Sequence, residues 1–550
     1  MASHDKPETA TGNASGSSVL ARAGKRPNIL LLMVDQLAVP YLPFHGHPVV
    51  KAPNLARLAA HGRVFDSAYC NFPICAPSRA SMLCGRLPHA IESWDNASEF
   101  PSDIPTVAHY LRRLGYHTAL AGKMHFIGPD QQHGFEHRLT TDIYPSDYAW
   151  TPDWLKGPEY RPTGVSMRPV AEAGPCTRSM QIDYDDEVEY QGMQKIHDLA
   201  RSPAEQPFFL TVSFTHPHPP FVASQRHWDL YPHSDIDMPR VAPIPYEKLD
   251  EHSRWLYLAH AQNLYTVTDD HIRNARHAYY GMISYIDEKI GRILDTLAET
   301  GLDRDTLIVF AGDHGEMLGE RGMWFKQTFF ESSVRVPLVF SWPGRIAAGR
   351  CAHHVSLVDL LPTLLDFAGG EANTDLVAPI DGQSLRPLLD APPSAKSGTD
   401  AMFADREIIA EYSSEGVRAA SRMVRRGPWK YVYTYQVAPM LFNLEDDPDE
   451  LRNLAGLPEF RNVEQLLHER VIQDWDPDII HQRILASQKR RLFLHEVAQL
   501  GKDYPNWAFQ PRSDASRQFI RGSGASGPTS VKARARYPYV EPVQPDRTAS

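Results

Sequence analysis

The chain has 550 residues, of which 42% are hydrophobic and 22% are charged, and its formal net charge is −11 at neutral pH. This composition predicts a globular protein with a large core and more than one domain. The acidic balance argues against binding to nucleic acid or to anionic membranes, because both need a basic surface.

The N-terminal residues 1–25 are polar, and their composition predicts a disordered tail. The apolar run that follows, ILLLMV at 29–34, is far shorter than the roughly 20 residues needed to cross a bilayer. No apolar segment of the secretory kind precedes it, so we expect a cytoplasmic protein. The five cysteines include no C-x-x-C pair, which predicts reduced thiols and no zinc site.

Helices and strands alternate from about residue 26 to residue 390. NILLLMV at 28–34 is a continuous apolar run, which predicts a strand buried on both faces of a parallel sheet. APNLARLAAHG and IPTVAHYLRRLG have apolar residues at helical spacing and end in glycine, so both are predicted helices. Further strands are predicted at 117–125, 208–216 and 305–313, and a long helix at 271–300. This alternation predicts a three-layer α/β sandwich around a large, mostly parallel sheet over residues 26–400.

The character of the sequence changes after residue 400. Short β-rich runs such as RMVRRGPWKYVYTY and PMLFNLEDD predict a smaller sheet domain over residues 401–464. Residues 465–550 contain charged helical segments followed by GSGASGPTS and a Pro/Arg-rich end. We therefore expect a C-terminal helical extension that ends in an arm.

Four of the predicted strands end in side chains that can do chemistry. They are Asp35 with Gln36, Lys123 with His125, His216 with His218, and Asp313 with His314. Ligands of open α/β sheets bind outside the carboxyl ends of the strands, so we expect these side chains to meet. An aspartate after a strand can also cap the next helix, but two of them beside an amide and an imidazole make a better metal site. Such ligands favour a hard cation, Ca²⁺ or Mg²⁺, with Mn²⁺ as an alternative because of the histidine.

Cys75 lies two residues before Pro77 in NFPICAPSRASMLCGR, at the start of a predicted helix. It can be a small buried hydrophobe, or a nucleophile placed at the positive end of that helix. Sulfur is a poor ligand for a hard cation, so a role beside the predicted metal site requires that oxygen replace it.

The stretch CAPSRASMLCGR resembles the motif of type I sulfatases in the alkaline phosphatase superfamily, whose cysteine is converted after translation to formylglycine (3-oxoalanine). The threonine that usually precedes the glycine is Cys84 here. NILLLMVDQ, GKMH, PHPP, GDHGEMLGERGMWFK and LFNLEDDPDELRNLA extend the resemblance over nearly all of residues 26–456. Two stretches, IPTVAHYLRRLGYHTALAGKMHFIGPDQQHGFEHRLTTDIYP and ERGMWFKQTFFESSVRVPL, resemble choline sulfatases. The tail from ASQKRRLFLHEV to YPNWAFQP is similar to the C-terminal extension of the same enzymes.

This resemblance implies a sulfuric ester hydrolase whose nucleophile is a hydrated formylglycine at position 75, held on one divalent cation. Ca²⁺ is the first expectation for that cation, with Mn²⁺ and Mg²⁺ as alternatives. The implied metal ligands are Asp35, Gln36, Cys75, Asp313 and His314.

The same resemblance implies roles for the other polar residues of the site. Arg79 and Lys123 would neutralise charge around residue 75 and the sulfuryl oxygens, and His125 would hold one of the geminal hydroxyls. Lys326 and His218 would meet the leaving oxygen, one of them as general acid. His216 is the alternative to His218, and Asn96 would contact the sulfate.

The choline sulfatase branch implies a small alkyl sulfate, choline sulfate, as the substrate. A quaternary ammonium group needs aromatic faces and a carboxylate, for which Trp150 with Glu411 or Glu415 are implied. Choline sulfatases commonly carry an aromatic-plus-His cluster after this tryptophan, where this chain has only Tyr160. The cage is either incomplete or filled by a neighbouring subunit's arm, which contains Tyr504, Trp507 and Phe509.

Other readings of the fold and of the cysteine stay open. Phosphonate monoester hydrolases and phosphodiesterases share this fold, and a sulfatase for another small sulfate ester is a further alternative. An unconverted Cys75 would leave a metal or anion binder with little turnover. The implied partners are the sulfate ester, the formylglycine-generating (sulfatase-maturing) enzyme and further copies of the chain, as a dimer or tetramer through the C-terminal arm, with no nucleic acid and no membrane.

Overall fold

The computed structural model describes residues 26–201, 206–369, 376–392, 402–500 and 507–510. The predicted tail at 1–25 and most of the predicted arm lie outside these ranges. Among the helices that are described, none combines the length and apolar character needed to span a bilayer.

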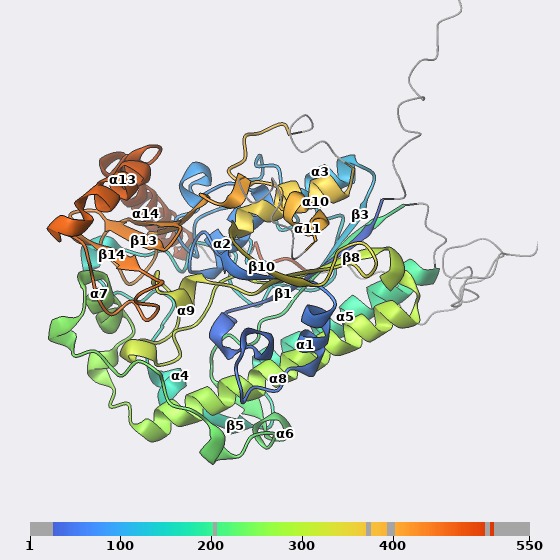
Figure 1. The fold of residues 1–550 in the computed structure, drawn as a ribbon, viewed down its shortest axis with the longest axis horizontal. Helices are drawn as coiled ribbons and strands as arrows, with labels where there is room; N and C mark the ends of the chain where they lie inside the picture. Colours follow the sequence, from blue (N-terminus) through green and yellow to red (C-terminus); the bar gives the residue numbers. More distant parts are fainter. Residues whose placement is uncertain (1–25, 202–205, 370–375, 393–401, 501–506, 511–550) are drawn as a thin grey trace, which may run out of the picture.

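An eight-stranded sheet runs through the centre of the molecule in the order β10-β2-β9-β8-β1-β6-β3-β4 (Figure 1). Its strands are β1 (Asn28–Val34), β2 (Arg63–Tyr69), β3 (His117–Gly122), β4 (His137–Arg138), β6 (Phe208–Ser213), β8 (Thr306–Gly312), β9 (Leu338–Ser341) and β10 (Gly349–Ser356). Only β9 runs antiparallel to its neighbours β2 and β8. The prediction of a large, mostly parallel sheet is confirmed.

The predicted strand NILLLMV is β1, which lies between β6 and β8. Leu31 pairs with Thr211 on one side and with Val309 on the other. The side chains of β1 alternate between two cores, as the pleat of a strand requires. Ile29, Leu31 and Met33 belong to one core, and Leu30, Leu32 and Val34 to the other. Burial on both faces therefore explains the unbroken apolar run.

Helices cover both faces of this sheet, which gives the predicted three layers (Figure 1). One face carries α1 (Pro53–Ala60), α5 (Met180–Arg201) and α8 (Asp269–Glu299). The other carries α2 (Cys75–Cys84), α3 (Val107–Arg113), α10 (Leu360–Phe367) and α11 (Arg386–Asp390). The helices predicted at 52–62, 104–115 and 271–300 are α1, α3 and α8.

A second, antiparallel sheet of four strands follows in the C-terminal part, in the order β11-β12-β13-β14. Its strands are β11 (Glu407–Tyr412), β12 (Ser421–Arg426), β13 (Trp429–Thr434) and β14 (Val437–Asn443). The helices α13 (Arg461–Ile472) and α14 (Pro477–Gln499) pack beside it, and α13 begins inside the range predicted to be β-rich (Figure 1). Shorter elements are α4 (Arg168–Ala171), β5 (Gly174–Cys176), β7 (Val222–Ser224), α6 (Gln225–Trp228), α7 (Glu251–Ala259) and α9 (Glu331–Val334).

A buried lysine fastens the second sheet to the first domain. Lys430 on β13 lies 2.7 Å from a carboxylate oxygen of Glu331 and 2.8 Å from one of Glu450, and it donates a hydrogen bond to the carbonyl of Phe329. Glu331 opens α9, a few residues after Lys326. The small sheet is thus tied to the segment that carries one of the predicted catalytic lysines.

Candidate active site

Four strands of the large sheet deliver the predicted residues to one edge. Asp35 follows β1, Lys123 follows β3, His218 lies beyond β6, and Asp313 follows β8, which ends one residue earlier than predicted. The Lys123 ammonium forms an ion pair with Asp35, and both side chains are completely buried. The expectation that the strand ends converge is confirmed.

Helix α2 brings Cys75 to the same edge, at its first position. All ten residues of α2 are buried, and Cys75 is 1% exposed. Asn96 supplies the missing cap of this helix, because its side-chain oxygen accepts a hydrogen bond of 3.0 Å from the Ala76 N–H. The Ser78 hydroxyl donates to the carbonyl of Asp313 at 2.6 Å, which fixes the helix against the end of β8.

Four potential ligand atoms, one of them the Cys75 sulfur, lie close together at this edge. One donor atom each of Asp35, Cys75, Asp313 and His314 lies within 4.8 Å of all the others, and all four residues are buried. The Cys75 sulfur is 3.7 Å from Asp35 Oδ1 and 3.3 Å from His314 Nε2. His314 Nδ1 donates to the carbonyl of Gly315 at 3.1 Å, which leaves the lone pair of Nε2 directed at the cluster.

This donor set fits a hard divalent cation. Two carboxylates and one imidazole are typical ligands of such ions, whereas the thiol is the one unsuitable donor. An oxygen at position 75, as in formylglycine, would make the set consistent. The nature of the ion does not follow from these ligands alone, because Ca²⁺, Mn²⁺ and Mg²⁺ all accept them.

Gln36 lies beside this cluster and links it to Lys326. Its backbone N–H donates to Asp313 Oδ1 at 3.0 Å, and its side-chain oxygen accepts from Lys326 Nζ at 2.6 Å. Its side-chain nitrogen donates to the buried Glu316. Among the residues that the structure describes, the amide of Gln36 thus serves as a bridge between an acid and a lysine.

Three cationic side chains surround the cluster, those of Arg79, Lys123 and Lys326. Arg79 donates from Nε to Asp313 Oδ2 at 2.8 Å and from Nη1 to the carbonyl of Lys123 at 2.7 Å. Lys326 Nζ lies 3.5 Å from the Cys75 sulfur. Arg79 Nη2 is buried and has no hydrogen-bond partner among the described residues. A buried, unpaired guanidinium N–H beside residue 75 is a ready donor for an anionic ligand.

The cations control the ionisation of the groups between them. Burial and the neighbouring thiol would raise the pKa of Asp35, but Lys123 and other cations outweigh them and lower it to about 2. Burial would likewise raise the pKa of the Cys75 thiol, which Lys123 and Lys326 instead hold well below its usual value. The site therefore stabilises negative charge at residue 75.

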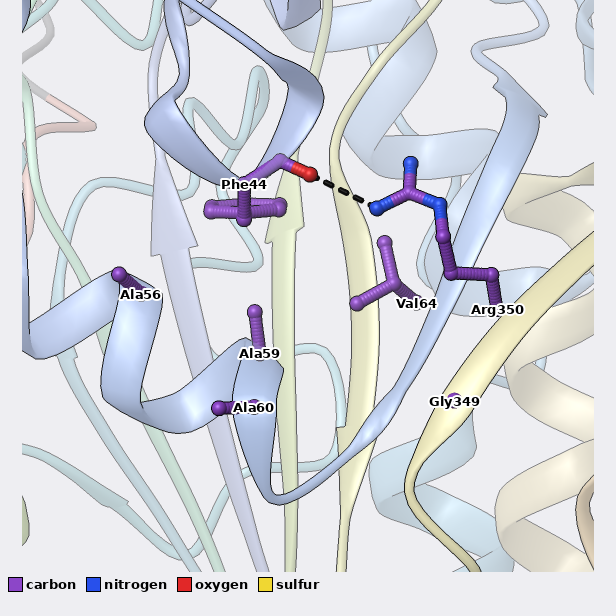
Figure 2. A pocket seen from close by; sticks show the side chains of 7 residues that line it. All are labelled: Phe44, Ala56, Ala59, Ala60, Val64, Gly349 and Arg350. Carbon is purple, nitrogen blue, oxygen red and sulfur yellow. Dashed lines mark hydrogen bonds between the residues drawn. The ribbon is translucent and has the colours of Figure 1, made fainter.

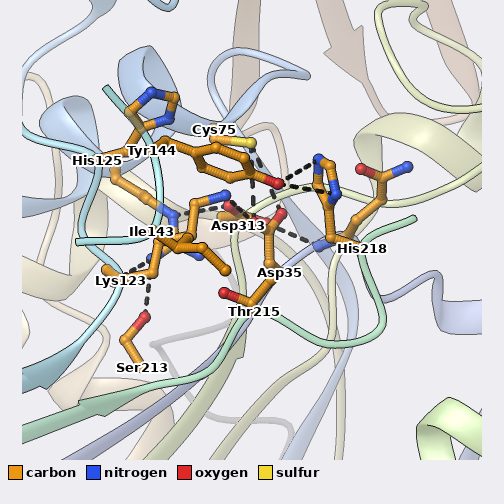
Figure 3. A network of polar contacts seen from close by, with 12 residues as sticks. Asp35, Cys75, Lys123, His125, Ile143, Tyr144, Ser213, Thr215, His218 and Asp313 are labelled. Atoms are coloured by element: carbon orange, nitrogen blue, oxygen red, sulfur yellow. Dashed lines mark hydrogen bonds and ion pairs between the residues drawn. The ribbon is translucent and has the colours of Figure 1, made fainter. Parts of the chain in front are cut away.

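Two histidines and one tyrosine form the side of the site that faces residue 75 (Figure 3). Asp142 accepts backbone hydrogen bonds from Met124 and His125, which holds His125 in a left-handed backbone conformation with φ 57°. Both ring nitrogens of His125 are buried without a hydrogen-bond partner among the described residues. The Tyr144 hydroxyl lies 3.0 and 3.3 Å from the two ring nitrogens of His218. His125 and His218 thus border the site from opposite sides of the tyrosine ring.

Tyr144 is a residue of this site that the sequence analysis did not assign. Lys123 Nζ lies 4.2 Å from the centre of its ring, and the rings of His125 and Trp150 lie 5.1 and 5.2 Å away. It stands in a loop at the end of a stretch that resembles choline sulfatases, and that resemblance gave it no role, because sequence spacing does not indicate these contacts. Trp150 meets the same group of rings, at 5.7 Å from His125.

Two residues with predicted substrate contacts have their partners elsewhere. His216 donates from Nδ1 to Asp185 on α5 at 2.6 Å and packs on Tyr285, because its ring points toward the helices instead of the site. Glu411 accepts a hydrogen bond of 2.9 Å from the backbone N–H of His89, and its other carboxylate oxygen lies 2.7 Å from the ring of the same histidine. None of these contacts reaches residue 75, so the substrate contacts of His216 and Glu411 stay predictions.

Glu415 has a different environment. It is 6% exposed and accepts hydrogen bonds of 2.8 and 2.9 Å from the Thr163 hydroxyl. Burial raises its pKa to about 7, although Thr163 and Lys326 act in the opposite direction. No described residue forms an ion pair with it.

A short segment of the predicted arm lies against the loop that carries Tyr144 and Trp150. Trp507 contacts Tyr148 edge to face at 5.3 Å, and Arg138 lies 5.2 Å above the ring of Phe509. Tyr504 lies outside the described residues. These contacts are made within one chain, at the outer side of the Tyr148 loop.

A separate apolar hollow lies between α1 and the strands β2 and β10 (Figure 2). Phe44, Ala59 and Val64 line it, and Arg350 closes it with a hydrogen bond of 2.7 Å to the carbonyl of Phe44. It contains none of the predicted site residues.

Comparison with protein families gives three matches that cover the chain in succession. The sulfatase profile matches residues 27–370. The profile of the C-terminal region of N-sulphoglucosamine sulphohydrolase matches residues 319–476, and that of the choline sulfatase C terminus matches residues 482–537.

Individual proteins give the same picture. Choline-sulfatase of Rhizobium meliloti (strain 1021) is 42% identical to this chain over 508 residues, which cover 90% of this chain and 96% of the relative. Arylsulfatase K of Homo sapiens is 30% identical over 510 residues, with coverage of 88% and 89%. The solved structure of the phosphonate monoester hydrolase of Agrobacterium radiobacter is 26% identical and superposes with a TM-score of 0.63, covering 82% of this chain and 95% of the other.

Proposed function

The chain belongs to the sulfatase family and is a choline-sulfatase-like sulfate ester hydrolase, and we propose that its substrate is choline sulfate, which it cleaves to choline and sulfate. The similarity to a choline-sulfatase over nearly the whole chain supports this substrate. The geometry adds a second line of support at the side of the site that contains Trp150.

The observation that carries the proposal is Glu415. Its carboxylate is buried, its hydrogen-bond donor is the neutral Thr163 hydroxyl, and no described residue forms an ion pair with it. A buried carboxylate without a cationic partner is unfavourable unless a ligand supplies the positive charge. Trp150, with Tyr144 beside it, offers the aromatic faces that a quaternary ammonium prefers.

We further propose that Asp35, Asp313 and His314 hold a Ca²⁺ ion together with residue 75, which is converted to formylglycine. The bound cation would supply Lewis-acid stabilisation of negative charge, and formylglycine would supply an oxygen nucleophile in place of the thiol. Gln36 is the weaker candidate ligand, since Lys326 and Glu316 already engage its amide.

Other side chains of the site would neutralise charge, donate a proton and position the groups around the sulfate. Arg79 and Lys123 are placed to neutralise the negative charge of the sulfuryl oxygens, and the unpaired Nη2 of Arg79 is a donor for one of them. Lys326, whose Nζ lies 3.5 Å from the Cys75 sulfur, and His218 would meet the leaving oxygen, and one of them would protonate it. His125, with both ring nitrogens unpaired, is placed to hold the oxygen at position 75.

An assay of paired substrates tests the proposal. The purified enzyme is assayed with three substrates. They are choline sulfate, an aryl sulfate that has no cationic group, and a phosphodiester that matches the sulfate ester. We expect kcat/KM to be highest for choline sulfate and lowest for the phosphodiester. A preference for phosphorus would favour the phosphonate hydrolase alternative, which the likeness to the Agrobacterium radiobacter enzyme keeps relevant.

We also propose that copies of this chain associate through α14. Near its C-terminal end this helix carries the exposed Phe493, Leu494 and Val497, and the exposed Leu500 directly follows it; Phe493 is 62% and Leu500 81% exposed. Exposed apolar residues that cluster on one helix are typical of an interface between subunits. Light scattering of the full chain and of Phe493→Glu tests this, and a monomer at all concentrations of the unmodified chain would contradict it.

A further inference from the structure

Helix α14 lies in the region that matches the choline sulfatase C terminus, and it carries a buried arginine. Arg491 is 5% exposed, and its partner Asp95 is completely buried. The guanidinium donates from Nη1 to Asp95 Oδ1 and from Nη2 to Asp95 Oδ2, both at 2.7 Å. Such a bidentate pair fixes the two groups in one plane and at one separation.

Asp95 belongs to the loop that caps the helix of residue 75. Its Oδ1 also accepts from the Ala97 N–H at 2.9 Å, so the carboxylate shapes the turn around Asn96. Asn96 in turn accepts from the Ala76 N–H. A displacement of Asp95 would therefore reach the first turn of α2 through a single intervening residue.

The same guanidinium reaches a second part of the site. Arg491 Nη1 donates to the Thr151 hydroxyl at 3.3 Å, and Thr151 directly follows Trp150. The Thr151 hydroxyl donates in its turn to the carbonyl of Tyr148 at 2.8 Å. Arg491 Nε bonds to Ser487 one turn earlier on α14, which keeps the guanidinium from turning away.

The neighbouring residues of α14 support this arrangement. Gln488, on the same buried side of the helix, accepts from the Trp154 N–H at 3.1 Å. Ser487, Gln488 and Arg491 are polar side chains at buried positions where helix packing alone would favour apolar ones. A buried ion pair adds little stability over a well-packed apolar pair, because the loss of hydration offsets the attraction between the charges. What it does supply is a defined geometry.

We propose that Arg491 is a positioning residue for substrate binding, which holds the Asn96 loop and the Trp150 segment at the separation that the substrate requires. The C-terminal extension would thereby help to set the positions of the residues that bind the substrate, without contacting the substrate itself. This inference rests on the proposed function only in that Asn96 and Trp150 contact the sulfate ester.

The test compares Arg491→Met, Arg491→Lys and Asp95→Asn with Arg490→Met, an exposed arginine on the same helix. For each variant, KM and kcat are measured with choline sulfate and with an aryl sulfate, together with thermal unfolding and hydrogen–deuterium exchange of residues 94–98 and 148–154. We expect Arg491→Met to raise KM about tenfold or more while kcat changes less than about threefold, with faster exchange in both segments. Arg491→Lys should recover part of the loss, Arg490→Met should match the parent, and Asp95→Asn combined with Arg491→Met should add little to Arg491→Met alone.

A normal KM and normal exchange in folded Arg491→Met would overturn the inference. So would a lysine variant that regains thermal stability without any gain in KM, since that pattern indicates a role in stability only. If Arg491→Met does not fold, Arg491→Lys and Asp95→Asn test the inference by the same measurements of KM and exchange. A normal KM and normal exchange in both of these variants would then overturn it. A parent enzyme that cleaves the aryl sulfate but not choline sulfate would refute the proposed substrate, while the aryl ester would still report on Arg491.

Discussion

Replacement of Glu415 by glutamine separates recognition of the cation from stability of the fold. Burial raises the pKa of Glu415 to about 7 in the folded protein, against an ordinary value of 4.5. The folded state therefore binds this proton more tightly than the unfolded state does. The stability that the protonated carboxyl provides is fully present below pH 4.5 and is lost as the pH rises through 7. The rise in pKa corresponds to about 3 kcal/mol.

Glu415→Gln removes this penalty, since a neutral amide of the same shape still accepts the Thr163 hydrogen bond. At pH 8 we expect the free energy of unfolding to exceed that of the parent by up to about 3 kcal/mol, with no gain at pH 4. The same variant loses the charge that we propose to face the quaternary ammonium. We expect KM for choline sulfate to rise about 30-fold, which corresponds to about 2 kcal/mol, and KM for an aryl sulfate without a cationic group to stay within about twofold.

Denaturant unfolding between pH 4 and pH 9 and steady-state kinetics with both esters measure these effects. In the parent enzyme, KM for choline sulfate should also rise as the pH falls below about 7, because protonated Glu415 cannot attract the cation. Glu459→Gln, at an exposed position, is the matched control and should change neither quantity. Equal effects of Glu415→Gln on the two esters, or a loss of stability at pH 8, would refute this reasoning.

Further variants test the remaining parts of the site. Trp150→Ala should raise KM for choline sulfate about tenfold or more, and KM for the aryl sulfate much less, because only the former presents a cation to the ring; equal effects would argue against cation recognition. The Cys75 peptide from active material should show the mass of formylglycine in place of a thiol, and activity removed by a chelator should return best with Ca²⁺; a retained thiol would favour a binding protein. Glu316→Gln should lower kcat about tenfold at unchanged metal content, because a second amide lets Gln36 turn its nitrogen toward Lys326; unchanged kcat would show that the orientation of Gln36 is unimportant.

The central part of the site could be predicted from sequence because a single rule of sheet geometry governs it. Asp35 and Asp313 end strands that are buried on both faces, and the carboxyl ends of parallel strands necessarily lie at one edge. The apolar runs that reveal those strands therefore locate the candidate ligands as well. The helix that begins at Cys75 brings the proposed nucleophile to the same edge.

The outer part of the site could not be predicted in this way. Tyr144 stands in a loop, and its contacts with Lys123 and His218 depend on loop geometry that no periodicity encodes. His216 and His218 are two residues apart in a strand-end segment, yet one ring turns to Asp185 and the other to Tyr144. Arg491 lies far along the chain from Asp95, so only the folded structure shows that the two form an ion pair.

The two parts of the site rest on different parts of the fold. The ligand cluster depends on the large sheet and α2, which lie within the region that matches the sulfatase profile. The substrate side depends on Glu415 after β11 and on Arg491 in α14, which belong to the C-terminal regions. We therefore expect substitutions of Glu415 to change mainly which alcohol is recognised, whereas Arg491 also reaches the Asn96 loop that caps α2.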